Sequence, residues 1–172
     1  MTARHIVPLP GYAPTIGRLV GMLTYARHTL LSTVDGLTTA ELDHLHDADA
    51  NSIGALLAHA AAVEWWYQVL TFEGRRATAE EEAPRLPALD LGEPGRRAVR
   101  GRPLAERLDE LAAVRATTLA ALAERDDAWL EAPLAADPTM NAHWAWFHVA
   151  EDEISHRGQI LWLRKRLPAR PA

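Results

Sequence analysis

Apolar residues recur at helical spacing over four long stretches of the chain. The first begins near Pro14, a residue that suits the first position of a helix, and ends at Gly36. The second covers residues 51–72, the third opens at Pro103, and the fourth covers residues 141–166. No comparable stretch alternates apolar and polar residues as a half-buried strand does. The pattern therefore predicts an all-α protein built as a four-helix bundle.

The remaining segments show no long helical pattern. Residues 1–11 contain two prolines and are expected to form an extended arm, and residues 167–172 a tail. Residues 73–102, between the second and third helices, are rich in glycine, proline and charged residues. We expect a long irregular excursion there, either a functional lid or an exposed segment, and we favour the exposed segment. The whole chain, 1–172, is then a single domain.

Ionisable residues interrupt the apolar stripe of the last predicted helix. The stripe consists of residues spaced four apart: Trp144, His148, Asp152, His156 and Ile160. Residues at this spacing share one face of a helix. Ionisable groups on a core-facing surface are costly unless they are paired, hydrogen-bonded or bound to a metal. Imidazole and carboxylate together are a common ligand set for a divalent transition metal, so the stripe indicates a metal site.

His59 provides a second signal of the same kind. It lies among small and apolar residues of the second predicted helix, and its position predicts an inward-pointing side chain. If the second and fourth helices face each other, His59 meets Asp152 and His156 in the core. Two imidazoles and one carboxylate would leave coordination positions open to water or substrate, and open positions indicate chemistry rather than scaffolding.

Two further residues could support this site. His148, one turn before Asp152, is an alternate ligand or a partner that orients the carboxylate. Glu64 could hold an imidazole by a hydrogen bond, although a solvated helix face explains it equally well. Four tryptophans flank the candidate ligands: Trp65, Trp66, Trp144 and Trp146. They are either packing residues, which we favour, or an aromatic wall around a substrate pocket.

Composition and charge limit the kinds of molecule that the protein is expected to bind. The chain has no cysteine, which excludes disulfides and a cysteine nucleophile. A net charge of -5 argues against binding to nucleic acid, because there is no excess of Lys and Arg to neutralise phosphates. No window approaches a membrane span or a signal peptide, so we expect a cytoplasmic protein without a membrane partner. Bundles with tryptophan-rich faces often self-associate, and we expect a homodimer.

Two motifs carry a resemblance to a known family. SIGALLAH followed by Glu64-Trp65, and HVAEDEISHRGQI in the last helix, resemble the DinB-like superfamily of four-helix bundles. This superfamily includes thiol-dependent S-transferases and mycothiol-dependent maleylpyruvate isomerases. The resemblance covers most of the chain in helix order, but its sharp motifs are confined to the second and fourth helices.

The resemblance also implies a ligand set. A histidine of the second helix and two residues four apart in the last helix bind a divalent metal, often zinc or nickel, which assigns these roles to His59, Asp152 and His156. The pair in the last helix is His-x-x-x-His or Glu-x-x-x-His in the family. This chain has Asp at the first position, one methylene shorter than Glu, so a small backbone adjustment is expected to bring its carboxylate within reach.

A divalent-metal-dependent enzyme is the function that the resemblance implies. It would activate a low-molecular-weight thiol, such as bacillithiol or mycothiol, for S-transfer or for isomerisation of a small electrophile. A metal-dependent hydrolase could use the same ligands. A non-catalytic, stress-associated dimer or small-ligand binder is the alternative from another class, because a fold does not determine a function. In that case the two histidines and the aspartate would have to satisfy one another by hydrogen bonds.

Overall fold

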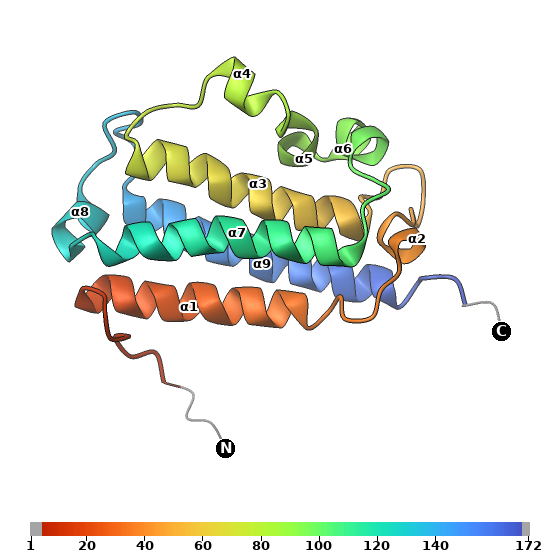
Figure 1. Ribbon diagram of the computed structural model, residues 1–172, viewed down its shortest axis with the longest axis horizontal. Helices are drawn as coiled ribbons and strands as arrows, with labels where there is room; N and C mark the ends of the chain where they lie inside the picture. The colour runs from red at the N-terminus through yellow and green to blue at the C-terminus, as the bar shows by residue number, and fades with distance from the viewer. Residues whose placement is uncertain (1–4, 170–172) are drawn as a thin grey trace.

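Four long helices form the body of the protein. The computed structural model describes residues 5–169. Its long helices are α1 (Pro14–Leu31), α3 (Ile53–Phe72), α7 (Leu104–Ala123) and α9 (Ala142–Arg164), which lie along the long axis (Figure 1). Its short helices are α2 (Thr39–Leu42), α4 (Ala79–Glu82), α5 (Leu86–Asp90), α6 (Gly92–Ala98) and α8 (Asp127–Glu131). The described residues form no strand, which confirms the predicted all-α class.

The long helices begin where the sequence predicts them. The side chain of Ser52 accepts a hydrogen bond from the backbone of α3, and that of Asn141 does the same for α9, so each satisfies a backbone N–H of the first turn. Pro103 precedes α7 directly. The first helix is shorter than predicted. It ends at Leu31, and turns rather than helix follow up to Gly36.

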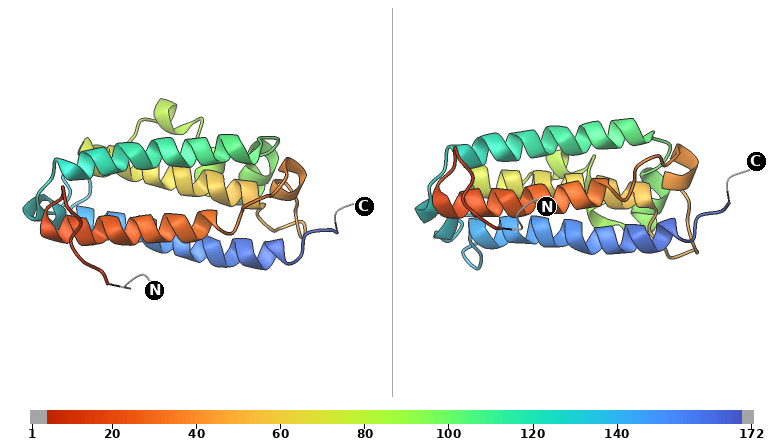
Figure 2. Two further views of the ribbon diagram at one scale, coloured as in Figure 1. Left: turned by 60° about the horizontal axis from the view of Figure 1, so that its bottom comes forward. Right: turned by 90° about the horizontal axis from the view of Figure 1, so that it is seen from below.

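The direction of the helices explains the long excursion. In Figure 1 α1 and α9 run from left to right, whereas α3 and α7 both run from right to left, and Figure 2 shows the four helices side by side from two other directions. Because α3 and α7 are consecutive and parallel, the chain must travel back along a helix of about 30 Å before α7 begins. Residues 73–103 make this return.

The excursion is more ordered than the sequence indicated. It forms the short helices α4, α5 and α6, and α5 packs on α3. Val99 is buried against Ala55 and Ala58 of α3. The expectation of an irregular segment is therefore wrong for α4, α5 and α6, whereas most residues of the segment are exposed or half-buried, as expected. The outer face of α3 needs this cover because it carries apolar residues such as Ala55 and Ala58.

Two apolar clusters fill the bundle. One gathers around Ile16, Leu23 and Trp146, and the other around Leu57 and Ile160. Within the described part of the chain, no helix is both long and apolar enough to cross a membrane.

A polar group inside the bundle takes one residue from each long helix. The four residues are Arg27, Glu64, Arg115 and Glu153, and we call them the buried quartet. Arg27 Nη2 lies 2.6 Å from Glu64 Oε2 and 2.6 Å from Glu153 Oε1. Arg115 Nε lies 2.7 Å from Glu64 Oε1, and its Nη2 lies 2.8 Å from Glu153 Oε1. Two positive and two negative charges therefore tie all four helices together.

The quartet was not predicted, although the sequence contains a signal for it. Each member occupies a position in the apolar register of its helix, for example Arg115 between Leu111 and Thr118. A charged residue in such a register on all four helices indicates mutual pairing, since an unpaired buried charge is very costly.

Candidate metal centre

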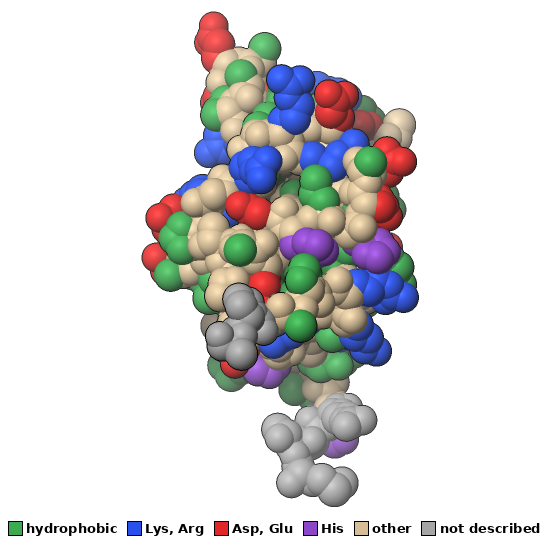
Figure 3. Space-filling view, turned by 90° about the vertical axis from the view of Figure 1, so that its right-hand side faces the viewer, with side chains coloured by type: hydrophobic (Ala, Val, Ile, Leu, Met, Phe, Trp, Pro, Cys, Tyr) green, Lys and Arg blue, Asp and Glu red, His purple; other side chains and the backbone are tan. Residues whose placement is uncertain are grey.

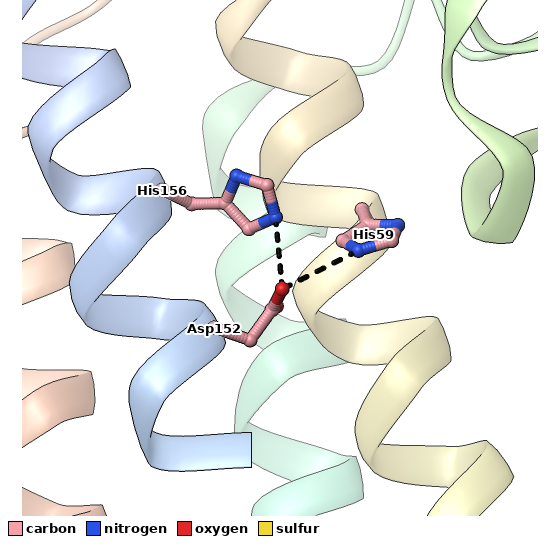
Figure 4. A group of neighbouring side chains, drawn as sticks. All are labelled: His59, Asp152 and His156. Carbon is pink, nitrogen blue, oxygen red and sulfur yellow. Dashed lines mark ion pairs between the residues drawn. The ribbon is translucent and has the colours of Figure 1, made fainter. Parts of the chain in front are cut away.

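The three predicted ligands meet between α3 and α9, which pack side by side (Figure 4). His59 comes from the middle of α3, and Asp152 and His156 lie one turn apart on α9. Asp152 Oδ1 lies 3.1 Å from His156 Nε2 and 3.6 Å from His59 Nε2. One ligand atom from each residue lies within 4.8 Å of the others. The shorter Asp side chain therefore reaches both imidazoles.

A backbone carbonyl orients the imidazole of His59. Its Nδ1 lies 2.8 Å from the carbonyl oxygen of Ala88, which can only accept, so Nδ1 carries the proton. The lone pair of Nε2 is then left on the side of Asp152. Metal-ligating histidines are commonly held in this way by their other ring nitrogen. Ala88 belongs to α5. No side-chain pattern could have predicted this contact, because every residue has a backbone carbonyl and the residue type does not show which one is used.

His156 is buried without a hydrogen bond. It is 7% exposed, and neither ring nitrogen has a hydrogen-bond partner among the described residues. Its Nε2 is close to Asp152 Oδ1, but the pair does not meet the geometry of a hydrogen bond. A buried polar atom without a partner costs about 1–3 kcal/mol. A cation held by the three residues would provide a partner for Nε2, so the donor set fits a divalent metal ion.

The charges of the cluster favour an ionised carboxylate. Burial opposes the charged form of Asp152, but His156 and His59 outweigh it and hold the pKa of Asp152 well below its ordinary value. Burial likewise opposes the charged form of His59. The carboxylate of Asp152 and the nearby carbonyls, including that of Ala88, outweigh burial and raise the pKa of His59. Asp152 thus contributes one negative charge to the centre, and a cation would compete with a proton for Nε2 of His59.

His148 lies outside the cluster. Its Nδ1 is 3.1 Å from Glu151 Oε2 and its ring stacks on Trp144, with centroids 5.1 Å apart. The prediction that it is an alternate ligand or a partner of Asp152 finds no support in these contacts. Residues four apart drift by about 40° around a helix, so two such steps carry His148 away from the direction of His156.

Glu64 is also not a partner of the imidazoles. It is fully buried, and its carboxylate accepts hydrogen bonds from Arg27, Arg115 and Thr118. Both the predicted bond to an imidazole and the alternative of a solvated face are wrong. Five residues separate Glu64 from His59, which places the two side chains about 140° apart around α3.

Comparison with known proteins now identifies the family. The model of the family described as mycothiol S-transferase matches residues 18–169. The chain belongs to the mycothiol S-transferase family. This is a DinB-like family, so the resemblance seen in the sequence is confirmed. No curated protein matches the chain.

One solved structure supports the fold of this family member. A conserved protein from Enterococcus faecalis, known from a crystal structure, superposes with a TM-score of 0.65. The match has 20% sequence identity and covers 86% of this chain and 94% of the other. At this identity the similarity confirms the fold alone.

Tyr67 connects the candidate centre of this mycothiol S-transferase family member with an aromatic group on α9. Tyr67, two turns after His59 on α3, makes ring contacts with Trp144 and His148. Burial and, after it, the charge of Asp152 raise the pKa of Tyr67 to about 12, so its phenol stays protonated. Tyr67 was not predicted from the sequence, because its spacing of eight residues places it about 80° from His59 around α3.

The tryptophans divide between the two predicted roles. Trp146 is fully buried and stacks on Phe72, as the packing role requires. Trp144 is 47% exposed, and its ring contacts those of Tyr67 and His148. The indole of Trp66 donates a hydrogen bond to Glu82 of α4, and that of Trp65 faces the side chain of an arginine in the excursion. Of the other three, Trp144 is exposed, whereas Trp65 and Trp66 are half-buried and Trp66 packs against the core.

Proposed function

We propose that the protein is a divalent-metal-dependent thiol S-transferase in which His59, Asp152 and His156 hold the metal. The observation that carries the proposal is the convergence of two imidazole nitrogens and one carboxylate oxygen from facing helices. Zinc and nickel both accept this ligand set. Three protein ligands leave a position for a substrate, which is typical of catalytic rather than structural metal sites. Membership of the mycothiol S-transferase family supports the same activity.

The chain's own groups prepare the site for a thiol. A divalent cation bound there supplies a thiolate near neutral pH, because it lowers the pKa of a thiol that coordinates to it. The carbonyl of Ala88 keeps the lone pair of His59 Nε2 directed into the site. Asp152 contributes a single negative charge, which leaves a divalent site with a net positive charge that favours an anionic sulfur.

The sulfur nucleophile comes from a low-molecular-weight thiol, since the chain contains no cysteine. The family points to mycothiol or a thiol of the same type, rather than bacillithiol. In the transfer, the sulfur forms a bond to an electrophilic carbon of a small molecule. The leaving group departs with its electron pair, and the thiol proton passes to solvent. The homodimer, the cytoplasmic location and a role in stress remain predictions.

Metal content is the first test of this proposal. The protein, prepared without a histidine tag, is analysed by mass spectrometry for bound metals, together with His59→Ala and His156→Ala. We expect about one equivalent of zinc, nickel or another divalent metal per chain in the wild type and its loss in both variants. His148→Ala is the matched control, because it removes an imidazole from α9 that lies outside the cluster. Absence of metal in the wild type, even after dialysis against zinc and nickel, would rule the proposal out.

Thiol transfer is the second test. Mycothiol and the electrophile monobromobimane are incubated with the metal-loaded protein, with the stripped protein and with the two ligand variants, and the conjugate is quantified by chromatography. We expect acceleration by the loaded wild type alone. A protein that binds metal but does not accelerate conjugation with any low-molecular-weight thiol would contradict the S-transferase and leave the metal site intact.

A further inference from the structure

A groove lies on the side of α3 that faces α7. Residues of the excursion between these helices form a further wall of the groove, and its cavity volume is about 470 Å³. Alanines of α3 form part of its lining, together with polar and aromatic side chains: Trp65, Arg85, Arg102, Arg107 and Glu110. His59, Asp152 and His156 do not line it, so the groove is separate from the candidate metal centre.

The lining carries an excess of positive charge. Arg85, Arg102 and Arg107 face one carboxylate, that of Glu110. Arg102 pairs with this carboxylate, with 3.0 Å between Arg102 Nη1 and Glu110 Oε2. The Nε of Arg102 pairs with Glu106, which does not line the groove. Figure 3 looks onto the end of the molecule that bears α6 and the start of α7, and it shows several Lys and Arg side chains in its upper part with Asp and Glu side chains among them.

Arg107 is the member of this group that lacks adequate partners. Its side chain is 6% exposed, and its guanidinium reaches Glu110 only at 3.5 Å. Its Nε is buried and has no hydrogen-bond partner among the described residues. Burial and the neighbouring Arg102 lower the pKa of Arg107, and the attraction of Glu110 and the more distant Asp43 does not compensate. A buried cation with one shared, long contact is costly, and an anion in the groove would offset that cost.

The walls indicate what kind of anion fits. The small side chains of Ala58, Ala61 and Ala62 leave a smooth apolar surface on α3. The guanidinium of Arg85 lies 4.1 Å from the ring centre of Trp65, so one end of the groove is both aromatic and cationic. A flat apolar body would pack on these surfaces, and a planar carboxylate matches the fork of a guanidinium.

We propose that this groove binds a small organic carboxylate, with its anionic end at Arg107 and Arg102 and its apolar body against the alanines of α3 and Trp65. None of the three candidate metal ligands lines the groove, so its ligand binding can be tested separately from the proposed thiol transfer. One link between them exists, because Ala88 lines the groove and its carbonyl orients His59. Binding is therefore tested on metal-free protein, so that failure of one proposal does not decide the other.

The probe is 2-naphthoate, and 2-naphthamide is its uncharged match in size and shape. Binding of both to the full-length protein is measured by titration calorimetry in the presence of a chelator. We expect saturable 1:1 binding of the acid and at least about tenfold weaker binding of the amide, because the amide cannot make charge-assisted hydrogen bonds to arginine. Equal binding of the two compounds would overturn the proposal. So would the lack of saturation by the acid at roughly 10 mM.

Variants locate the site. Arg107→Gln should weaken binding of 2-naphthoate by about tenfold or more. Because Arg107 is buried, Arg102→Gln provides a second variant at a side chain that is 43% exposed and should leave folding intact. Arg97→Gln is the matched control, since its side chain is 80% exposed on the same segment and does not line the groove. Unchanged affinity in Arg102→Gln and in folded Arg107→Gln, or an equal loss in Arg97→Gln, would overturn the assignment.

Discussion

Replacement of Arg115 by methionine tests the buried quartet. Arg115 donates hydrogen bonds to Glu64 and Glu153, and its Nη1 donates to the carbonyl of Leu23 at 2.8 Å. Methionine fills a similar length without charge. In the variant the two carboxylates, 0% and 1% exposed, would share Arg27 alone, and the core would carry one uncompensated negative charge.

The expected cost follows from this burial. Removal of one partner from a buried ion pair costs about 3–5 kcal/mol, because the remaining charge stays desolvated. In a domain of this size 1 kcal/mol lowers the melting temperature by about 2–4 °C, so we expect a decrease of roughly 6–20 °C. The loss is a large fraction of a total stability of about 5–15 kcal/mol.

Urea unfolding followed by circular dichroism measures this free energy. The double variant Arg115→Met/Glu64→Gln removes one charge of each sign, and we expect it to recover at least about 1 kcal/mol relative to Arg115→Met alone. Arg97→Met, at an exposed pair 3.6 Å from Glu93, is the control and should change stability by about 0.5 kcal/mol or less. A loss below about 1 kcal/mol in Arg115→Met, with no recovery in the double variant, would refute the reasoning.

The same variant has a functional consequence. Glu64 follows His59 on α3, and Glu153 lies between Asp152 and His156 on α9, so the quartet sets the position of the helices that carry the three candidate ligands. We therefore expect Arg115→Met to weaken metal binding although Arg115 contacts none of these ligands. Unchanged metal affinity in a destabilised but folded variant would show that the helices keep their spacing without the quartet.

Three further predictions concern single positions. Asp152→Asn keeps the size of the side chain but removes its charge, and metal affinity measured by chelator competition should fall by more than the roughly tenfold to hundredfold typical of outer-sphere changes. Phe substitution of Tyr67 should leave metal content unchanged but alter the KM for the thiol, because its hydroxyl borders the charge of Asp152. The carboxylate of Asp127 accepts hydrogen bonds from the backbone and side chain of Thr15 at the start of α1. Burial opposes the charge of this carboxylate, but the hydrogen bonds from Thr15 outweigh burial and lower the pKa of Asp127 below its ordinary value. This contribution is present above the ordinary pKa and is lost as the pH falls through the lowered one, so Asp127→Asn should reduce stability at neutral pH and flatten its acid dependence in denaturation curves.

Helix positions and the metal-ligand candidates could be predicted from the sequence. The period of apolar residues and local caps such as Ser52 and Asn141 are properties of neighbouring residues, so they define α3 and α9 without knowledge of the fold. His59, Asp152 and His156 stood out because ionisable groups interrupt otherwise apolar faces. Family resemblance added that these faces meet, and the structure brings the three side chains together.

Only the tertiary structure decided which polar groups pair. Glu64 was expected near an imidazole, but its angular position on α3 turns it toward the arginines of α1 and α7. The carbonyl of Ala88 reaches His59 because consecutive parallel helices force the excursion back across α3. The cationic groove around Arg107 arises from that same return of the chain. Such contacts join residues that are distant in sequence and depend on the direction of whole helices, which no local pattern of residues encodes.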